Sequence, residues 1–248
     1  MMSAARAGGK VLRKYFGREL ALVQKTKHMD FCTQADLGSE RVILSLLRKR
    51  FPEYNTYAEE TGERRRGSDW TLVVDPLDGT YNFVIGVPQF SIPIALTHRG
   101  QLVASVVYHP MLNLMYYAQR GKGAYINGSR IRVNQESRYS HSTVAYVGGY
   151  RNMRRTHWGI INAIVRKRCK RMIIHWSPAL DFCLLASGRI EGIVNNNSEI
   201  YDFLAGKLIA QEAGARITDF RGKRETADLN SEFIASNGRV HAALLHSV

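Results

Sequence analysis

Apolar residues recur at helical spacing in two segments near the start of the chain. Between residues 3 and 16 they lie three or four positions apart, which predicts a helix. From Asp36 to Phe51, an apolar stripe faces away from most of the arginine and lysine side chains. This second pattern predicts an amphipathic helix that packs through one face.

A series of short apolar runs follows, and such runs are typical of strands. They cover residues 71–75, 90–97, 102–109 and 113–118. Glycine turns such as Arg99-Gly100 separate several of these runs, which predicts an antiparallel meander. Asn127-Gly128 further predicts a tight turn.

The pattern changes near residue 140, where predicted strands and helices begin to alternate. Strands are expected at 142–147, 171–175 and 190–195, and helices at 156–168, 178–187 and 202–214. Pro178 suits the first turn of its helix, because the N–H that proline lacks needs no partner there. The alternation favours an α/β half at residues 141–248 behind an α+β half at residues 1–140, both within one compact unit.

The segment from Trp70 to Phe83 contains the strongest candidates for functional residues. An apolar run ends at Asp75, Pro76 stops the strand, and Asp78 follows on a backbone that Gly79 allows to bend. Two carboxylates beside the Thr80 hydroxyl suit a hard cation such as Mg²⁺. The amides of Gly79 and Thr80 could receive a phosphate if a helix begins there. A plain turn closed by Asp and Gly is the alternative, and these residues alone leave both open.

The segment Asp75-Pro76-Leu77-Asp78-Gly79-Thr80 resembles the signature of the inositol monophosphatase family of Mg²⁺-dependent, lithium-sensitive phosphatases. Three more segments resemble family motifs in the same order: residues 30–36, residues 58–62, and residues 201–206 with 212–214. The resemblance covers nearly the whole chain. It implies a layered α-β-α-β-α sandwich of the sugar-phosphatase type, with the site between the two halves.

The resemblance also implies a ligand set for two or three Mg²⁺ ions per site. Asp75 would bridge two ions, and Glu59 with the main-chain oxygen of Leu77 would complete the first. Asp78 and Asp202 would complete the second. Inhibition by Li⁺ is implied in the same way.

The resemblance assigns further roles in catalysis and substrate binding. Thr80 would hydrogen-bond the attacking water, and Asp36 would accept from Thr80, with Glu59 as the third catalytic residue. The residues expected to contact phosphate or substrate are Gly79, Thr80, Ser177, Asn195 and Arg189.

The substrate side departs from the family pattern. Trp176-Ser177-Pro178-Ala179 stands where many members have Gly-Ser-Ala-Ala, and Asn195 takes the place of a glutamate that binds inositol hydroxyls. Inositol 1-phosphate or a related sugar phosphate is the first expectation. Arg189 and Arg64–Arg66 could instead meet a second phosphate, as in fructose 1,6-bisphosphate. Activity on 3′-phosphoadenosine phosphate is another alternative, although those relatives usually have Lys-Glu-Phe where this chain has Tyr81-Asn82-Phe83.

The net charge of +14 allows a function of another class. Basic clusters at Arg64–Arg66, Arg151–Arg155 and 166–171 would attract anionic substrates, RNA or an acidic partner. For any single cluster a solvated basic face is the favoured explanation, because no interleaved aromatic residues accompany it. Some bacterial relatives act on RNA polymerase, so a regulator that binds RNA or RNA polymerase is the alternative. The family resemblance also implies a homodimer, to which residues 104–118 could contribute.

Cysteine content and hydropathy bear on the compartment. Three cysteines are too few and too scattered for a disulfide framework or a zinc site. No apolar run reaches the length of a membrane span, and the basic N-terminus lacks the apolar core of a signal peptide. These features favour a reduced, cytoplasmic protein without membrane contact.

Overall fold

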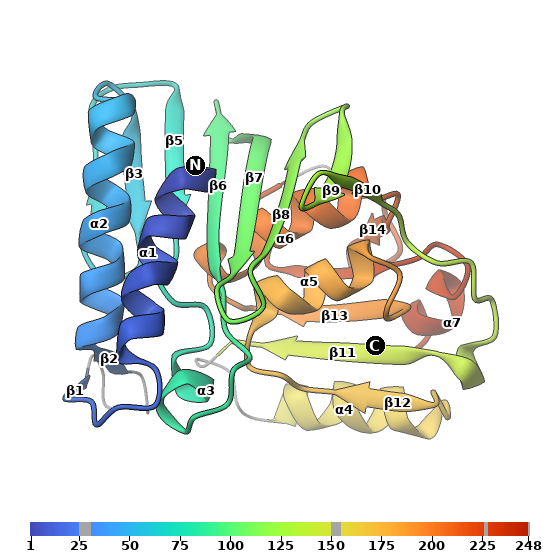
Figure 1. Cartoon of the computed structure of the whole chain (residues 1–248). Helices are drawn as coiled ribbons and strands as arrows, with labels where there is room; N and C mark the ends of the chain where they lie inside the picture. Colours follow the sequence, from blue (N-terminus) through green and yellow to red (C-terminus); the bar gives the residue numbers. More distant parts are fainter. Residues whose placement is uncertain (25–30, 150–154, 226–227, 248) are drawn as a thin grey trace.

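Helices and sheets alternate in five layers (Figure 1). The computed structural model describes residues 1–24, 31–149, 155–225 and 228–247, so Asp30 and Arg151 to Arg154 lie outside the described residues. The helices are α1 (Met2–Tyr15), α2 (Gln34–Arg50), α3 (Thr80–Val84), α4 (Arg155–Arg166), α5 (Pro178–Ala186), α6 (Ile200–Glu212) and α7 (His241–Leu245), with a 3₁₀ turn at Tyr139–His141.

The strands form two main sheets within the described residues. The first has the order β10-β9-β8-β7-β6-β5-β3-β4, and the second β12-β11-β13-β15-β14, while β1 and β2 pair separately. The strands are β1 (Leu22–Gln24), β2 (Phe31–Thr33), β3 (Asn55–Ala58), β4 (Gly62–Arg64), β5 (Trp70–Val74), β6 (Ile92–His98), β7 (Gln101–His109), β8 (Leu114–Gln119), β9 (Gly123–Ile126), β10 (Ser129–Ile131), β11 (Thr143–Gly148), β12 (Arg171–Ile173), β13 (Gly192–Asn196), β14 (Arg216–Thr218) and β15 (Glu232–Ser236).

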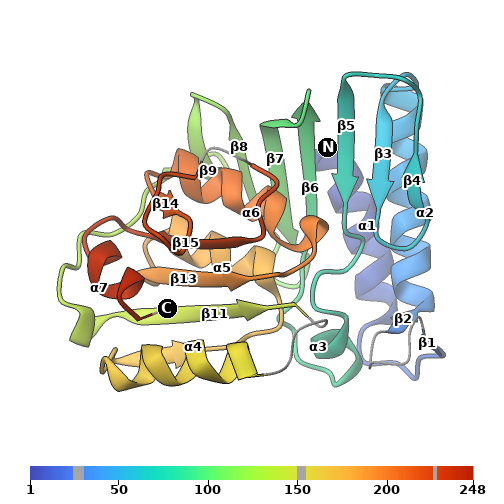
Figure 2. The same cartoon turned by 180° about the vertical axis from the view of Figure 1, so that it is seen from behind.

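Helices α5 and α6 form the middle layer and pack between the two sheets (Figure 2). One apolar cluster joins Leu102 of the first sheet, Phe203 and Leu208 of α6, and Phe233 of the second sheet. Since α6 meets a sheet on either side, residues 203–210 are all buried. Helices α1 and α2 cover the opposite face of the first sheet, and α4 and α7 cover that of the second. The layered sandwich expected from the sequence is confirmed.

Most predicted elements are present, with shifted ends that have local causes. Helix α2 begins before Asp36 because Thr33 caps it and Asp36 occupies its third position, in a capping box. Helix α6 likewise begins before Asp202, since Glu199 is its cap. The meander is confirmed as β6 to β10, each strand antiparallel to the next. The short strands β3 and β15 had not been predicted.

The tight turn predicted at Asn127-Gly128 is confirmed between β9 and β10. Both residues have positive φ, at 46° and 91°, which matches the right-handed twist of a two-residue hairpin. No helix in the described part of the chain combines the length and the apolarity that crossing a bilayer requires.

Candidate active site

The site begins where two parallel strands of the first sheet end. Strands β3 and β5 pair in parallel, so Glu59 and Asp75 follow them at the same edge of the sheet. The Glu59 amide donates to the carbonyl oxygen of Val74 over 3.1 Å, which keeps the two segments side by side. Figure 2 shows both strands pointing toward α3, which follows the Asp75 turn.

The turn after β5 is buried and held from both sides. Asp75 is 1% exposed, and its Oδ1 accepts from the Leu77 amide at 2.8 Å. The Ser39 hydroxyl of α2 donates to the carbonyl oxygen of Pro76, also at 2.8 Å. The α2 layer therefore fixes the backbone that presents Asp75 and the Leu77 carbonyl.

Asp78 connects the two halves of the chain. Its backbone pairs with Ser91 through two hydrogen bonds of 2.9 Å. Its Oδ2 accepts from the hydroxyl of Ser91 at 2.8 Å and from that of Ser177 at 2.7 Å. Ser177 caps α5, so the middle layer directly contacts this carboxylate. Ser177 was expected to contact phosphate or substrate, but in this structure its hydroxyl group donates its hydrogen bond to Asp78.

Gly79 is required by its conformation and by its neighbours. Its φ is 98°, and a Cβ placed there would lie 2.9 Å from the carbonyl oxygen of Gln89 and 3.3 Å from that of Trp176. Trp176 itself has φ of 56°, an unusual value for a bulky residue, and its side chain is 41% exposed. The segment that departs from the family pattern therefore packs directly against the Asp75–Thr80 turn.

The expected contact between Thr80 and Asp36 is present. Thr80 Oγ1 lies 3.0 Å from Asp36 Oδ1 and 3.0 Å from the carbonyl oxygen of Leu77. Asp36 Oδ2 accepts from the amide and the hydroxyl of Thr33, which fixes the carboxylate in place. Burial raises the pKa of Asp36, against these hydrogen bonds.

Asp202 reaches the site from the first turn of α6. Its Oδ2 accepts from the Glu199 amide at 3.0 Å, so the cap of α6 orients the carboxylate. Tyr201 lies beside it, and burial together with Glu59 and Asp202 raises the pKa of the Tyr201 hydroxyl. Asp202 is thus placed with acids that precede it by more than a hundred residues.

The acids at this site raise one another's pKa. Burial and the charges of Glu59, Asp78 and Asp202 hold the pKa of Asp75 well above its usual value, and burial with Asp78 and Glu59 does the same for Asp202. Burial raises the pKa of Asp78 to about 7, although Ser177 and Ser91 act in the opposite direction. Within the described residues, no lysine or arginine forms an ion pair with Asp75, Asp78 or Asp202.

This donor set fits a divalent cation in its chemistry. Buried carboxylates that repel one another are stabilised by a positive charge, and oxygen donors suit Mg²⁺. Within the described part of the chain, no group of three or more His, Cys, Asp or Glu side chains has the arrangement of a formed metal site.

Two of the expected substrate residues have other partners or another location in the structure. Asn195 is fully buried, and its amide is engaged: Nδ2 donates to the Ser231 carbonyl at 2.7 Å and Oδ1 accepts from Ser198. Arg189 is exposed beyond the carboxyl end of α5. Ser177 caps the other end of this nine-residue helix, about 13 Å away at 1.5 Å per residue.

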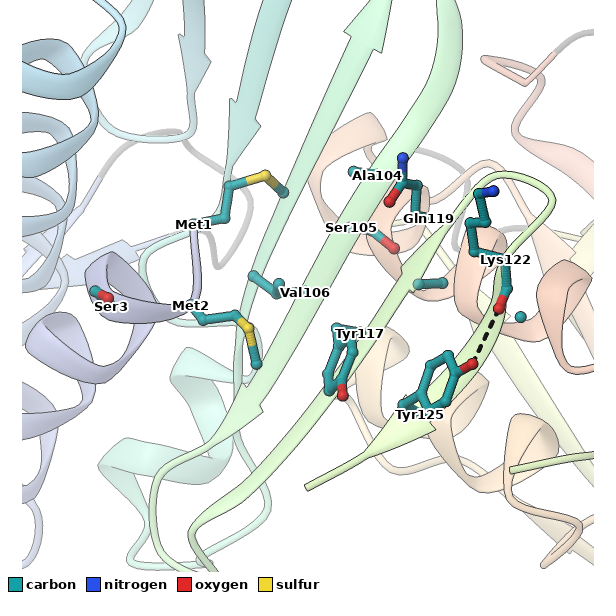
Figure 3. Close-up of a pocket in the computed structure, with 12 residues that line it drawn as sticks. Met1, Met2, Ser3, Ala104, Ser105, Val106, Tyr117, Gln119, Lys122 and Tyr125 are labelled. Atoms are coloured by element: carbon teal, nitrogen blue, oxygen red, sulfur yellow. Dashed lines mark hydrogen bonds between the residues drawn. The ribbon is translucent and has the colours of Figure 1, made fainter. Parts of the chain in front are cut away.

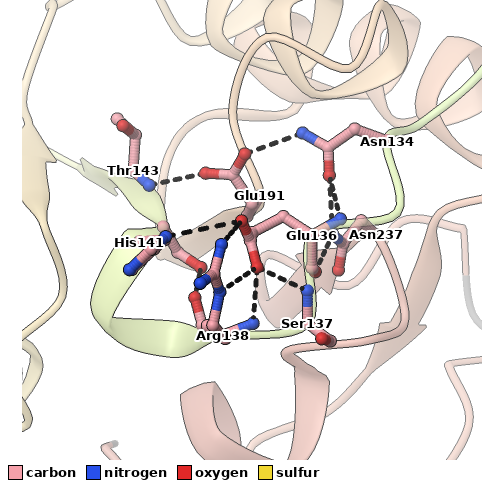
Figure 4. Close-up of polar contacts among 9 residues, drawn as sticks. Asn134, Glu136, Ser137, Arg138, His141, Thr143, Glu191 and Asn237 are labelled. Carbon is pink, nitrogen blue, oxygen red and sulfur yellow. Dashed lines mark hydrogen bonds and ion pairs between the residues drawn. The ribbon is translucent and has the colours of Figure 1, made fainter.

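A structural polar network lies around Glu191, in the connection between α5 and β13 (Figure 4). Glu191 accepts from the Thr143 amide at 2.6 Å and from Asn134 Nδ2 at 2.7 Å. Glu136 accepts from the Arg138 amide at 2.8 Å. The Glu191 carboxylate fastens the segment before β11 to the α5–β13 connection, whereas the Glu136 carboxylate holds the turn of its own segment.

Glu40 supports the site, although the sequence analysis did not identify it. It is buried on α2, and its two carboxylate oxygens accept from the amides of Glu60 at 2.9 Å and Thr61 at 3.0 Å. Glu40 therefore fixes the turn that carries Glu59. Its spacing of four from Asp36 places both acids on one face of α2, and that signal was available in the sequence.

A cavity of about 470 Å³ lies away from these acids, on the outer face of the first sheet (Figure 3). Met1, Met2, Val106, Tyr117 and Tyr125 contribute to its lining, and none of the lining residues is acidic. The rings of Tyr117 and Tyr125 stack at 5.4 Å between centroids. This cavity does not coincide with the acidic site.

Comparison with known proteins agrees with these motifs. The chain is 37% identical to the fructose-1,6-bisphosphatase/inositol-1-monophosphatase of Thermotoga maritima over 233 residues, covering 94% of this chain and 88% of the relative. It is 33% identical to the Nus factor SuhB of Escherichia coli (strain K12) over 247 residues, covering 98% and 91%.

Solved structures show the same fold. The extragenic suppressor protein suhB from Bartonella henselae superposes with a TM-score of 0.92 at 31% identity, covering 100% of this chain and 96% of that one. The Thermotoga maritima IMPase gives a TM-score of 0.89 at 34% identity, covering 99% and 94%. The sequence profile of the inositol monophosphatase family matches residues 1–248. The chain therefore belongs to the inositol monophosphatase family.

Proposed function

We propose that the protein hydrolyses small phosphate monoesters with the help of Mg²⁺. The observation that carries this proposal is the set of mutually repelling acids around Asp75, drawn from both halves of the chain, beside the Thr80–Asp36 contact. Glu59, Asp75 and the Leu77 carbonyl would hold one ion, and Asp75, Asp78 and Asp202 another. Bound Mg²⁺ supplies positive charge that lowers the pKa of water and neutralises the leaving oxygen.

The residues of this chain would orient water and substrate. Thr80 accepts a hydrogen bond from the attacking water and passes its own proton toward Asp36, whose raised pKa suits a proton acceptor. The amides of Gly79 and Thr80 are assigned to the phosphate. Ser177 acts through Asp78, which it orients. Lithium is expected to inhibit by replacing Mg²⁺.

Inositol 1-phosphate or a related sugar phosphate is the proposed substrate, and fructose 1,6-bisphosphate is the alternative. Both activities appear in the name of the Thermotoga maritima relative. Because Arg189 lies at the far end of α5, it is a poor candidate for a second phosphate bound by the same chain. We expect Arg189→Ala to leave the ratio of the two activities unchanged.

Phosphate release tests the proposal directly. Wild type, Asp75→Asn and Thr80→Ala are compared on both substrates and on 3′-phosphoadenosine phosphate, with Mg²⁺ or with EDTA. Asp69→Asn is the matched control, because it makes the same change at an exposed carboxylate paired with Arg99. Release that requires Mg²⁺ and is lost in both site variants supports the proposal. Activity that persists in Asp75→Asn would contradict it.

A second candidate function rests on the charge distribution of the chain. Residues 137–180 contain nine arginine and lysine residues and no aspartate or glutamate. Five of these, at positions 166–168, 170 and 171, are exposed from the end of α4 to the start of β12. Trp158 on α4 is 64% exposed and offers a ring on which a base can stack. Binding of an RNA segment here agrees with the Nus factor names of several relatives.

Binding of a labelled RNA oligomer, measured by anisotropy at several salt concentrations, tests this second function. Replacing residues 166–168 by glutamine should weaken binding and reduce its salt dependence, whereas Asp75→Asn should not. The same triple change at Arg64–Arg66 is the control for total charge. Equal loss in both triple variants would indicate attraction without a defined surface.

A homodimer is the proposed assembly. Residues 104–118 are largely buried in β7 and β8, and Met111 and Leu112 are the exposed apolar residues of that stretch. Ile85 and Val87 after α3 also expose apolar surface. Sedimentation of wild type and Leu112→Asp tests whether this turn contributes.

A further inference from the structure

Lys207 is a fully buried lysine in the middle layer, on the helix that begins near Asp202. Its exposed fraction is 0%. The ammonium group lies 4.4 Å from the ring centre of Phe233 and 5.5 Å from that of Phe203. Nζ donates to the carbonyl oxygens of Asp228 at 2.9 Å and Asn230 at 3.3 Å. A buried cation is thus enclosed by two aromatic rings and one segment of backbone.

Burying an ammonium group is less favourable than burying an apolar side chain of the same length. Burial lowers the pKa of Lys207 to about 8, while Glu225 and Asp228 act in the opposite direction. A methionine would fill the same space without this penalty, but it could not donate to two carbonyls. We therefore attribute the presence of a lysine here to the hydrogen bonds that it donates to the carbonyl oxygens of Asp228 and Asn230.

The segment held by Lys207 contacts both sheets. On the first sheet, Asp228 Oδ2 accepts from the Leu102 amide at 2.8 Å and from Arg120 at 2.5 Å. On the second sheet, the Ser231 carbonyl accepts from Asn195 Nδ2 at 2.7 Å and from the Asn197 amide at 2.9 Å. Residues 228–231 therefore bridge the start of β7 and the end of β8 to the end of β13.

The same arrangement reaches the proposed metal site. The chain passes from β13 directly into the cap of α6 at Glu199, which orients Asp202. Lys207 lies five residues after Asp202, about 7.5 Å along the helix axis. The other acids, Glu59, Asp75 and Asp78, belong to the first half. Their distance to Asp202 depends on how the two halves are fixed together.

We propose that Lys207 is a positioning residue, which holds residues 228–231 across both sheets and so sets the spacing between Asp202 and the acids of the first half. This inference rests on the proposed metal site. Losing the ammonium group would leave the carbonyls of Asp228 and Asn230 without this donor and loosen the bridge between the halves. The affinity for a divalent cation should then fall, although Lys207 does not touch the cation.

Binding of Mn²⁺ to the full chain, followed by electron paramagnetic resonance of the unbound ion, tests this without measuring activity. Lys207→Met should weaken binding about tenfold, the lower end of the usual effect of residues that orient metal ligands. Lys223→Met is the matched control, since it makes the same change at an exposed lysine. Circular dichroism at the same temperature establishes that each variant is folded.

Asp228→Asn serves as a second variant in case Lys207→Met does not fold. It keeps the carbonyl that Lys207 uses and an acceptor for Leu102, but removes the charge opposite Arg120, so weaker Mn²⁺ binding is again expected. Unchanged affinity in a folded Lys207→Met, even with a lower melting temperature, would overturn the inference while leaving the metal site intact. Absence of Mn²⁺ binding in wild type would overturn the proposed metal site itself, and this inference with it.

Discussion

Replacing Asp78 by asparagine should stabilise the metal-free protein at neutral and higher pH. Burial raises the pKa of Asp78 from 3.8 to about 7. One pKa unit corresponds to about 1.4 kcal/mol, so a shift of roughly three units corresponds to about 4 kcal/mol. This is the free energy by which ionised Asp78 destabilises the folded state. Asparagine has nearly the same shape, still accepts from Ser91 and Ser177, and carries no charge.

The pH dependence follows from the direction of the shift. The folded pKa lies above the unfolded one, so between about pH 4 and pH 7 the folded state binds more protons. The contribution of Asp78 to the stability of wild type therefore falls as pH rises through this window and levels off above it. The advantage of Asp78→Asn should be small near pH 4 and approach its full value, at most about 4 kcal/mol, at pH 8.

Urea unfolding in EDTA at several pH values measures this difference. Asp69→Asn should change stability by less than about 1 kcal/mol at every pH, because its carboxylate is exposed and paired at the surface. Saturating Mg²⁺ should reverse the order by stabilising wild type more than Asp78→Asn. An Asp78→Asn variant that is less stable than wild type at pH 8 in EDTA would refute the reasoning.

Three other substitutions test local features of the site. Gly79→Ala should lose at least 2 kcal/mol or so in urea unfolding, because it combines positive φ with a backbone clash, whereas Gly100→Ala, with φ of 77° and open space, reports the strain alone. Trp176→Gly should relieve about 1 kcal/mol of left-handed backbone strain. It should also raise kcat/KM for inositol 1-phosphate relative to kcat/KM for glycerol phosphate. An unchanged ratio of these two values would show that the Trp176 ring does not select the substrate. Ser177→Ala should raise the pKa of Asp78 further and lower the free energy of unfolding by about 1 to 2 kcal/mol. The loss should be larger at pH 8, where Asp78 is ionised, than at pH 5. An equal loss at the two pH values would contradict this electrostatic explanation.

The sequence was most informative where the chemistry is local. The turn from Asp75 to Thr80 follows from a strand end, a proline and a glycine within six residues, so its shape could be predicted without knowing any partner. The contact of Asp36 with Thr80 came from the family resemblance, since no local rule joins residues 44 apart. Family membership also gave the layered fold, which the alternation of elements only suggested.

Long-range partners could not be predicted from local patterns. Asn195 and Arg189 were expected to contact the substrate, and no local pattern indicated that Ser231 would engage the amide of Asn195 or that Arg189 would lie at the far end of α5. Strand β15 pairs between β13 and β14, an order that depends on tertiary packing. The burial of Lys207 could not be predicted either, because nothing in the neighbouring sequence indicates that α6 lies between two sheets.

The shared middle layer has a consequence for synthesis of the protein. The first sheet is complete once residue 131 has been made, but the helices that cover its inner face end only at residue 212. At 5 to 20 residues per second, adding those 81 residues takes roughly 4 to 16 s. During that interval the nascent chain presents a bare apolar sheet face. A ribosome-bound chaperone would find its target there, and pausing before α6 would lengthen the exposure.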